Sequence, residues 1–257
     1  MKTKIIAHRG DKKKFPENTM LSFIKAVDKG ADAIELDIQH TKDKKIIIHH
    51  DYYLGNSDNG KGLLLNKNSN YLLSLDCGSW FSSKFDGEKM PLLEDVFKKF
   101  GKNINYEIEL KGFSKEFIVD VLRLVEKFYL LKNIEFTSPH VYILSKLKDL
   151  NPRVKTGFFV DKFPDWMDVD LGLMITRNNL SLGNIDVVHI PWNIINKSTV
   201  KIFHKHNLKV HASNCNSTES IDLALKSGVD QLSTDELDLA IELQKRYDTN
   251  HRKNRSK

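Results

Sequence analysis

Short apolar runs rich in β-branched residues alternate along this chain with longer amphipathic stretches. Such alternation is typical of a parallel sheet whose strands are joined by helices. Nine segments have the strand pattern: residues 5–8, 33–39, 46–50, 104–111, 134–137, 154–160, 185–191, 208–213 and 230–234. Amphipathic stretches lie between most of them, among them residues 19–30, 115–130, 141–150, 196–207 and 217–228.

The spacing of two strand segments reduces the nine to eight. Only the six residues HTKDKK separate residue 39 from residue 46, whereas a parallel crossover needs about a dozen residues or more. Residues 46–50 are therefore predicted to return antiparallel to residues 33–39. The remaining eight strand–helix units predict an α/β fold of the (β/α)8 TIM-barrel type, for which 257 residues is an ordinary length.

Residues 52–91 interrupt this rhythm because they are rich in glycine and have no clean period. A loop of this length in a small domain is usually functional or a subdomain. We expect an insertion after the second strand, lying over the end of the barrel, with its apolar stretch YLLSLDCGSWF packed onto the barrel. The predicted organisation is one barrel domain over residues 1–247 with this insertion, followed by a basic tail at 248–257.

The composition excludes several classes of protein. Lys and Arg number 40 against 34 Asp and Glu, and the excess forms no basic stripe, which argues against nucleic-acid binding. The two cysteines are far apart and lack metal-ligand spacing, which favours a reducing compartment. The first residues are too poor in apolar side chains for a signal peptide, and no run of eighteen apolar residues exists, so we expect a cytoplasmic protein without a transmembrane segment.

Carboxylates occur at alternate positions in two apolar strand segments. Glu35 and Asp37 share one face of a strand, with Cα atoms roughly 6.5 Å apart. Burying both is costly unless a cation lies between them, although a salt-bridged or solvated pair at a strand edge is the simpler alternative. Glu107, Glu109 and Lys111 follow the same period. Glu109 beside the first two carboxylates predicts an oxygen-rich site for one hard divalent cation, Mg²⁺ or Ca²⁺.

Two histidines end strand segments beside charged residues. His8 precedes Arg9, and His50 precedes Asp51. Imidazole titrates near neutral pH, so the two histidines are candidates for a general acid and a general base. Arg9 and Lys111 supply the positive charge that an anionic phosphate needs. Three other histidines are predicted to lie on the surface: His49, His204 and His206.

The blocks AHRG, PENT, GADAIELDI, TKDKKIIIHHD, IELK and GVDQLSTDE resemble the glycerophosphodiester phosphodiesterase family in order and spacing, over residues 4 to about 240. The resemblance implies a (β/α)8 barrel that hydrolyses glycerophosphodiesters, which are small molecules, to glycerol phosphate and an alcohol. It also implies roles by position: His8 and His50 as the acid/base pair, Glu35, Asp37 and Glu109 as metal ligands, Arg9 and Lys111 as phosphate contacts, and Glu17 and Asn18 as residues that touch the glycerol or orient His8.

The sequence departs from the family at Glu107, where a small amide is usual, and at Ser213, where an aromatic residue is usual. Two alternatives stay open: a lipid phosphodiesterase, such as a lysophospholipase D or a phospholipase C-like barrel, and a non-catalytic ligand-binding barrel. The latter would be expected to have lost a histidine or a metal carboxylate, and none is missing. The sequence leaves undecided which histidine is the acid, which cation binds, which alcohol is released and the oligomeric state.

Overall fold

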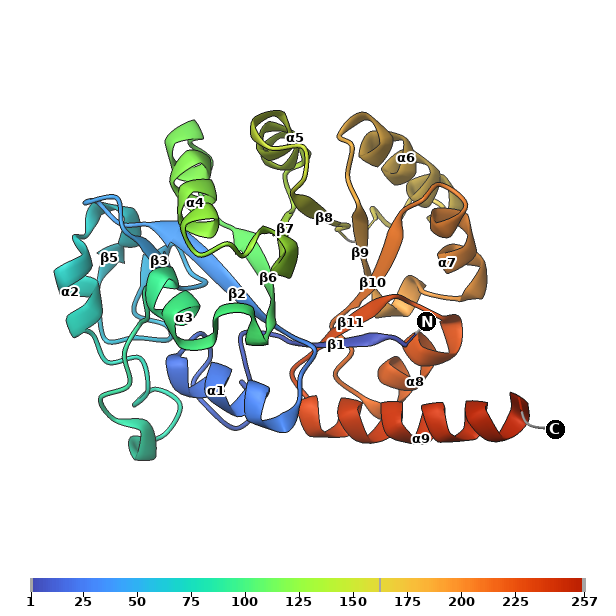
Figure 1. Cartoon of the computed structure of the whole chain (residues 1–257), viewed down its shortest axis with the longest axis horizontal. Helices are drawn as coiled ribbons and strands as arrows, with labels where there is room; N and C mark the ends of the chain where they lie inside the picture. The colour runs from blue at the N-terminus through green and yellow to red at the C-terminus, as the bar shows by residue number, and fades with distance from the viewer. Residues whose placement is uncertain (1, 162, 256–257) are drawn as a thin grey trace.

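Eight parallel strands close into a barrel, as the spacing of the strand segments predicts (Figure 1). The computed structural model describes residues 2–161 and 163–255, with side chains as far as residue 249. The barrel strands are β1 (Lys4–Ala7), β2 (Ala33–His40), β6 (Asn105–Leu110), β7 (Ile134–Ser138), β8 (Lys155–Phe159), β9 (Val187–Pro191), β10 (Lys209–Ser213) and β11 (Gln231–Thr234). The ring closes because β1 pairs with both β11 and β2. The predicted TIM-barrel fold is therefore confirmed.

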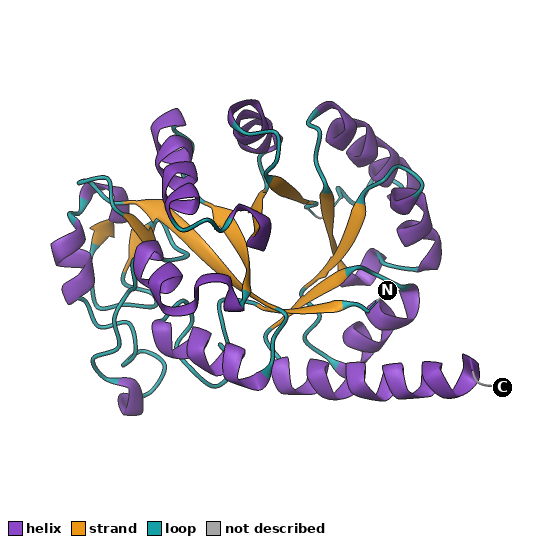
Figure 2. Cartoon of the chain, in the orientation of Figure 1, coloured by secondary structure: helices purple, strands orange, loops and turns teal. Residues whose placement is uncertain are grey.

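Helices surround the strands on the outside (Figure 2). They are α1 (Met20–Lys29), α3 (Leu93–Phe100), α4 (Lys115–Lys127), α5 (Val141–Leu150), α6 (Val169–Leu182), α7 (Lys197–His204), α8 (Thr218–Ser227) and α9 (Leu237–Arg255). The five amphipathic stretches singled out above become α1, α4, α5, α7 and α8. Local signals set their ends: the Thr19 side chain caps α1 by accepting from the Ser22 backbone N–H, and Ser217 and Ser220 form a capping box on α8.

The short strand β3 (Ile46–Ile48) returns antiparallel to β2, as the six-residue spacing predicts. One edge of β2 pairs with β6 over Ala33–Ile38. The other edge is shared: β1 pairs with its first two residues, and β3 pairs with residues 38–40. Because β1 pairs only with the beginning of β2, β3 can pair with the C-terminal part of the same edge of β2. The residues that follow β3 therefore reach the end of the barrel at which β1 stops.

The insertion after β3 forms a small unit with its own apolar centre. It contains β4 (Tyr53–Leu54), β5 (Gly62–Leu63), α2 (Ser69–Ser74) and two turns of 3₁₀ helix, η1 (Leu64–Asn66) and η2 (Ser83–Phe85). The buried apolar cluster is formed by Ile47, Leu54, Leu64, Leu72, Leu75, Cys77 and Met90. The unit lies beside β3 at one side of the barrel (Figure 1). It borders the barrel end through Tyr52, whose hydroxyl donates to the Lys111 carbonyl, and through Phe85, whose ring meets that of Phe15.

The interior of the barrel is unusually polar. The register places Glu35 beside Glu107 and Asp37 beside Glu109 on the adjacent strands β2 and β6. Further round the ring, the inward positions include four more polar side chains: Glu135, His189, His211 and Gln231. Layers inside a TIM barrel are ordinarily filled by Val, Ile and Leu. The apolar core of this protein lies instead between the strands and the surrounding helices, where residues such as Ile34, Phe136 and Phe203 are fully buried.

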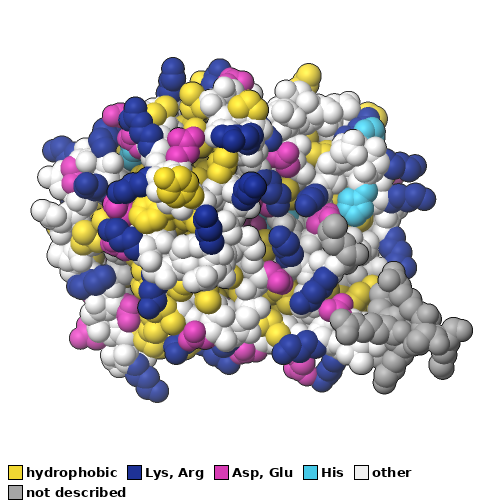
Figure 3. All heavy atoms as spheres, in the orientation of Figure 1, with side chains coloured by type: hydrophobic (Ala, Val, Ile, Leu, Met, Phe, Trp, Pro, Cys, Tyr) yellow, Lys and Arg dark blue, Asp and Glu magenta, His cyan; other side chains and the backbone are white. Residues whose placement is uncertain are grey.

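Helix α9 continues to Arg255, so the backbone of the predicted basic tail is helical as far as that residue. Its side chains from residue 250 onward lie outside the described part of the chain. Cys77 and Cys215 are both buried and free. Among the described residues, no helix is both long enough and apolar enough to cross a membrane. On the face drawn in Figure 3, Lys and Arg side chains are scattered among acidic and uncharged ones, with no continuous basic band.

Candidate active site

The end of the barrel at which the parallel strands finish, here called the mouth, begins with a tight turn after β1. Arg9 and Gly10 both have positive φ angles, of 55° and 83°. A Cβ atom on Gly10 would lie 2.4 Å from the Ser22 Oγ, so only glycine fits where the chain passes α1. The turn directs the Arg9 backbone N–H to Glu35, at 2.8 Å from its Oε2 atom. The turn therefore links the end of β1 to the first of the predicted metal ligands.

The lysine-rich loop after this turn is paired with acidic residues that follow β11. The Lys13 Nζ lies 2.8 Å from Glu236, and the Lys14 Nζ lies 2.5 Å from Asp238. Lys12 turns inward, 3.3 Å from Asp235. These ion pairs join the loops that follow the first and last strands, which explains why so much charge follows the strand that ends in His8.

The three carboxylates predicted as metal ligands converge at the mouth. One oxygen from each of Glu35, Asp37 and Glu109 lies within 4.8 Å of the other two. Burial, reinforced by the charge of Asp37, raises the pKa of Glu35 well above its usual range and that of Glu109 to about 7. Asp37 Oδ1 is buried without a hydrogen-bond partner. A crowded, partly unsatisfied set of oxygen atoms fits a hard divalent cation.

Two cationic side chains lie against the most buried of these carboxylates. The Lys111 Nζ is 3.3 Å from Asp37 Oδ1 and 2.6 Å from Glu109 Oε1, and the Arg9 Nε is 3.2 Å from Asp37 Oδ2. Burial alone would raise the pKa of Asp37, but the charges of Lys111 and Arg9 outweigh burial and hold it well below its usual range. Asn18 donates from Nδ2 to Asp37, and Glu17 accepts from the Arg9 guanidinium. Both loop residues thus orient the charged groups of the mouth in this structure.

Each of the two predicted histidines is held by a carboxylate through its Nδ1 atom. The His8 Nδ1 is 2.7 Å from Asp235 Oδ1, and the His50 Nδ1 is 2.7 Å from Asp51 Oδ1. The His8 Nε2 faces Glu35, 4.0 Å from its Oε2 atom. Because the carboxylates accept the Nδ1–H, the Nε2 atoms are left as the reactive nitrogens.

Asp235 is the functional residue that the sequence reasoning missed. It lies directly after β11 in the block STDE, which was used above only as part of the family resemblance. A polar residue at the end of a barrel strand was the available signal. Burial would raise the pKa of Asp235, but its hydrogen bond with His8 lowers it below the usual range. Asp235 is therefore ionised and able to hold the imidazole.

The prediction that His49 lies on the surface is wrong. His49 is buried, and its Nε2 atom is 3.0 Å from Asp58 Oδ2, while its Nδ1 atom is 3.0 Å from the Asp51 carbonyl. His49 follows β3 directly, where the insertion covers it. A third partner is the Ser57 Oγ atom, 3.2 Å from Nε2, and the bond to the Asp51 carbonyl fixes the backbone that follows His50. His204 and His206 are exposed, as predicted.

A second group of side chains lies deeper inside the barrel. One atom from each of Glu107, Glu135, His189 and His211 lies within 4.8 Å of the others, so this group could also hold a metal ion. Sequence reasoning identified only Glu107, as a carboxylate without an explanation. The polar cluster gives the explanation: Glu107 faces the two imidazoles, with its Oε1 atom 3.6 Å from His189 and its Oε2 atom 3.2 Å from His211.

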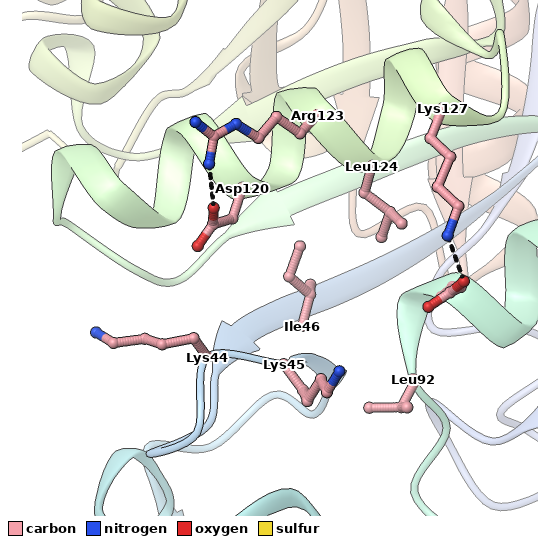
Figure 4. A pocket seen from close by; sticks show the side chains of 9 residues that line it. Lys44, Lys45, Ile46, Leu92, Asp120, Arg123, Leu124 and Lys127 are labelled. Carbon is pink, nitrogen blue, oxygen red and sulfur yellow. Dashed lines mark hydrogen bonds and ion pairs between the residues drawn. The ribbon is translucent and has the colours of Figure 1, made fainter.

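A basic pocket outside the barrel contains none of these residues. Figure 4 shows it between the β2–β3 hairpin and helices α3 and α4, with a volume of about 280 Å³. Two of its cations are already paired, Arg123 with Asp120 at 3.3 Å and Lys127 with Glu94 at 2.9 Å. We therefore place the candidate site at the mouth and not in this pocket.

The chain resembles known proteins both in sequence and in fold. The family model described as Glycerophosphoryl diester phosphodiesterase family matches residues 8–239. YhdW of Bacillus subtilis is 32% identical over 241 residues, covering 92% of this chain and 96% of the relative. The glycerophosphodiester phosphodiesterase of Caldanaerobacter subterraneus is 30% identical over 252 residues, covering 95% and 98%. Among solved structures, an Oleispira antarctica phosphodiesterase in complex with the product sn-glycerol-3-phosphate superposes with a TM-score of 0.80 at 26% identity, covering 94% of this chain and 97% of that one.

Proposed function

The chain belongs to the glycerophosphoryl diester phosphodiesterase family and is a phosphoric diester hydrolase, and we propose that it uses one divalent cation and two histidines to hydrolyse glycerophosphodiesters to glycerol phosphate and an alcohol. The observation that carries the proposal is the convergence at the mouth of three carboxylates, two cations and two carboxylate-held histidines. These groups come from strands and loops far apart in the sequence, and a barrel mouth is where this fold carries its chemistry.

Glu35, Asp37 and Glu109 are the proposed metal ligands. A bound Mg²⁺ or Ca²⁺ would supply positive charge to the phosphate oxygens. Arg9 and Lys111 add fixed positive charge on either side of Asp37 and orient the phosphate. In this proposal the Glu17 carboxylate holds the Arg9 guanidinium in place, because a bidentate donor must be fixed in direction to bind a phosphate well.

His8 and His50 are the proposed acid/base pair. One accepts the proton of the attacking hydroxyl at its Nε2 atom, and the other donates a proton from its Nε2 atom to the leaving oxygen. Asp235 and Asp51 hold the opposite nitrogens and stabilise the imidazolium form of each ring. Burial lowers the pKa of His50, which favours its neutral form at neutral pH.

The buried part of the insertion's apolar stretch gives no support to a lipid substrate. Leu72, Leu75 and Cys77 are buried in the insertion's own cluster, so they offer no apolar surface to an acyl chain. Tyr71 and Trp80 of the same stretch are exposed. The lipid-phosphodiesterase alternative would need an apolar surface at the mouth, and the buried side chains of this stretch do not supply it.

The test is hydrolysis by the purified full-length protein of glycerophosphocholine, glycerophosphoethanolamine, glycerophosphoglycerol and a lysophospholipid, with and without EDTA. We expect release of glycerol phosphate from at least one glycerophosphodiester, loss of that activity in EDTA, and its recovery with Mg²⁺ or Ca²⁺. Full activity in excess EDTA would remove the metal from the proposal. Turnover of the lysophospholipid alone would reassign the substrate to the lipid class.

A further inference from the structure

The polar cluster inside the barrel has a shortage of hydrogen-bond donors around Glu107. Glu107 is only 2% exposed, and its Oε2 atom is buried without a hydrogen-bond partner. His189 Nδ1 and His211 Nε2, on rings that are fully buried, also have none. Leaving such groups unsatisfied destabilises the folded protein. A cation or a proton held between Glu107 and His189 Nδ1 would remove the cost for those two groups.

The donors nearby are used by the other carboxylate of the cluster. Glu135 accepts from Lys155 at 2.5 Å, from His189 Nε2 at 2.7 Å, and from the Gln231 amide at 3.0 Å on each oxygen. The Gln231 amide nitrogen also lies 3.1 Å from His211 Nδ1, to which it donates, so no N–H of Gln231 is left for Glu107. His189, which gives its Nε2–H to Glu135, presents the bare lone pair of Nδ1 toward Glu107.

This arrangement of His189 is the one that metal-bound histidines adopt. A ligating imidazole usually donates its other N–H to a carboxylate, which fixes the ring and raises its basicity. Here Glu135 is that carboxylate. The His189 and His211 rings are stacked with centroids 4.0 Å apart, and the Nδ1 atom of each faces a Glu107 oxygen.

The backbone leaves room for this pair. A Cβ atom on Gly157 would lie 2.4 Å from His189 Nε2 and 2.7 Å from Glu135 Oε1. Any other residue at this inward position of β8 would displace the histidine from its carboxylate. The glycine therefore makes space inside the barrel for the His189–Glu135 pair.

We propose that Glu107, His189 and His211 bind a second divalent cation of the Zn²⁺ type inside the barrel, with Glu135 orienting His189. Two imidazoles and a carboxylate are ligands that Zn²⁺ and similar transition metals prefer, whereas Mg²⁺ and Ca²⁺ prefer oxygen ligands alone. The mouth offers only carboxylates and the interior offers nitrogen as well. In this proposal the mouth binds Mg²⁺ or Ca²⁺, and the layer below it inside the barrel binds a cation of the Zn²⁺ type.

The interior site opens away from the mouth. A cavity of about 230 Å³ is lined by Glu107, Glu135 and Gln231 together with residues at the beginnings of the strands. Four lysines also line it: Lys4, Lys132, Lys155 and Lys209. A free cation therefore meets a positively charged entrance, so the ion is best supplied while the protein is being made.

The experiment separates the interior ion from the one at the mouth. The full-length protein is produced in cobalt-supplemented minimal medium, because Co²⁺ replaces Zn²⁺ and its visible absorption is strong only at low coordination number. A variant carrying Glu35→Gln, Asp37→Asn and Glu109→Gln lacks the ligands at the mouth, and we expect it to retain about one cobalt ion per chain with a strong visible band. Adding His189→Gln should remove both the ion and the band, whereas adding His204→Gln, on the exposed surface, should change neither.

Cobalt content and the visible band do not depend on catalysis, because every protein compared carries the three substitutions at the mouth. A mouth variant free of cobalt, or one that keeps its cobalt and band after His189→Gln, overturns the interior site. If His189→Gln does not fold, Glu107→Gln keeps the shape of the side chain and should likewise remove the ion. A Glu107→Gln protein with unchanged cobalt content would mean that Glu107 shares a proton with the histidines and binds no metal.

Discussion

The His8 Nδ1 atom at the end of β1 lies 2.7 Å from the Asp235 Oδ1 atom at the end of β11, although 227 residues separate the two in the sequence. The hydrogen bond joins the first and last strands of the barrel across their closure. It also fixes which nitrogen of His8 faces the mouth, because the Nδ1–H is given to the carboxylate. The first prediction follows from this pair.

Asp235→Asn is expected to lower kcat by about 10²-fold with little change in KM, because His8 loses its orienting carboxylate but the phosphate contacts remain. The measurement is steady-state kinetics of the single variants and of the double variant with His8→Ala. The two losses should be far from additive, since both act through one imidazole. Additive losses would mean that Asp235 acts independently of His8.

His8→Ala and His50→Ala are each expected to reduce turnover by about 10²-fold or more while the fold is kept, since general acid–base groups contribute on that scale. The matched control is His204→Ala, which removes an exposed histidine that also bonds an aspartate, Asp230, at 2.8 Å. Its turnover should equal that of the wild type. Circular dichroism checks folding. Near-normal turnover of His8→Ala or of His50→Ala would show that the histidine concerned takes no part in the mechanism.

Glu109→Gln is expected to weaken binding of the catalytic cation by about tenfold or more, because affinity for a hard cation depends on the number of charged ligands. Activity should fall at limiting metal and recover in part at high metal, as measured by titration with Mg²⁺ and Ca²⁺. Glu116→Gln, which changes an exposed residue paired with Lys44, is the control and should titrate as the wild type does. Glu107→Gln should affect this titration less than Glu109→Gln, since it lies one layer deeper.

In the metal-free protein, the Glu109 carboxyl is expected to lower stability progressively as the pH rises from about 4.5 to about 7. The pKa of Glu109 is raised from 4.5 to about 7 in the folded state, so the folded protein holds a proton that the unfolded chain has released over this range. Stability falls with pH wherever the folded state binds more protons. Thermal unfolding in EDTA should show a steeper fall for the wild type than for Glu109→Gln, and parallel curves would contradict the assignment. Adding metal should reduce the difference.

Asp58→Ala is expected to destabilise the protein by about 1–3 kcal/mol, because it removes the charged side-chain partner of the buried His49 and leaves only the Ser57 hydroxyl at Nε2. Turnover should also fall at temperatures where the variant is folded, since His49 fixes the segment that carries His50. The control is Asp86→Ala, an exposed residue of the same insertion, for which we expect neither change. Normal turnover of a folded Asp58→Ala protein would limit His49 to a structural role.

Period and spacing were sufficient to predict the barrel and the carboxylates at its mouth. The alternation at Glu35 and Asp37, and again at Glu107 and Glu109, predicts side chains on one face, and neighbouring parallel strands place the two pairs side by side. The six-residue gap before β3 predicts its antiparallel return, since too few residues remain for a crossover.

The missed residues depend on contacts between distant segments. Asp235 meets His8 only when β11 pairs with β1, and no local sequence pattern indicates that contact. His189 and His211 each lie in an apolar strand, where a single histidine resembles an ordinary core residue. Their partner Glu135 comes from a third strand, and the register of the whole sheet is needed to bring the three together. His49 is buried by the insertion, whose fold the sequence pattern did not predict.

The pairing of β1 with β11 also determines the point in translation at which we first expect activity. During synthesis His8 is made 227 residues before Asp235, and the acidic residues that pair with the lysine loop are made together with Asp235. A nascent chain therefore carries His8 without the group that orients it until β11 and Asp235 have been made. Contacts of such long sequence separation also form slowly. We therefore expect activity only once the ring is complete, and we expect a chain truncated before β11 to be inactive even if its other strands had folded.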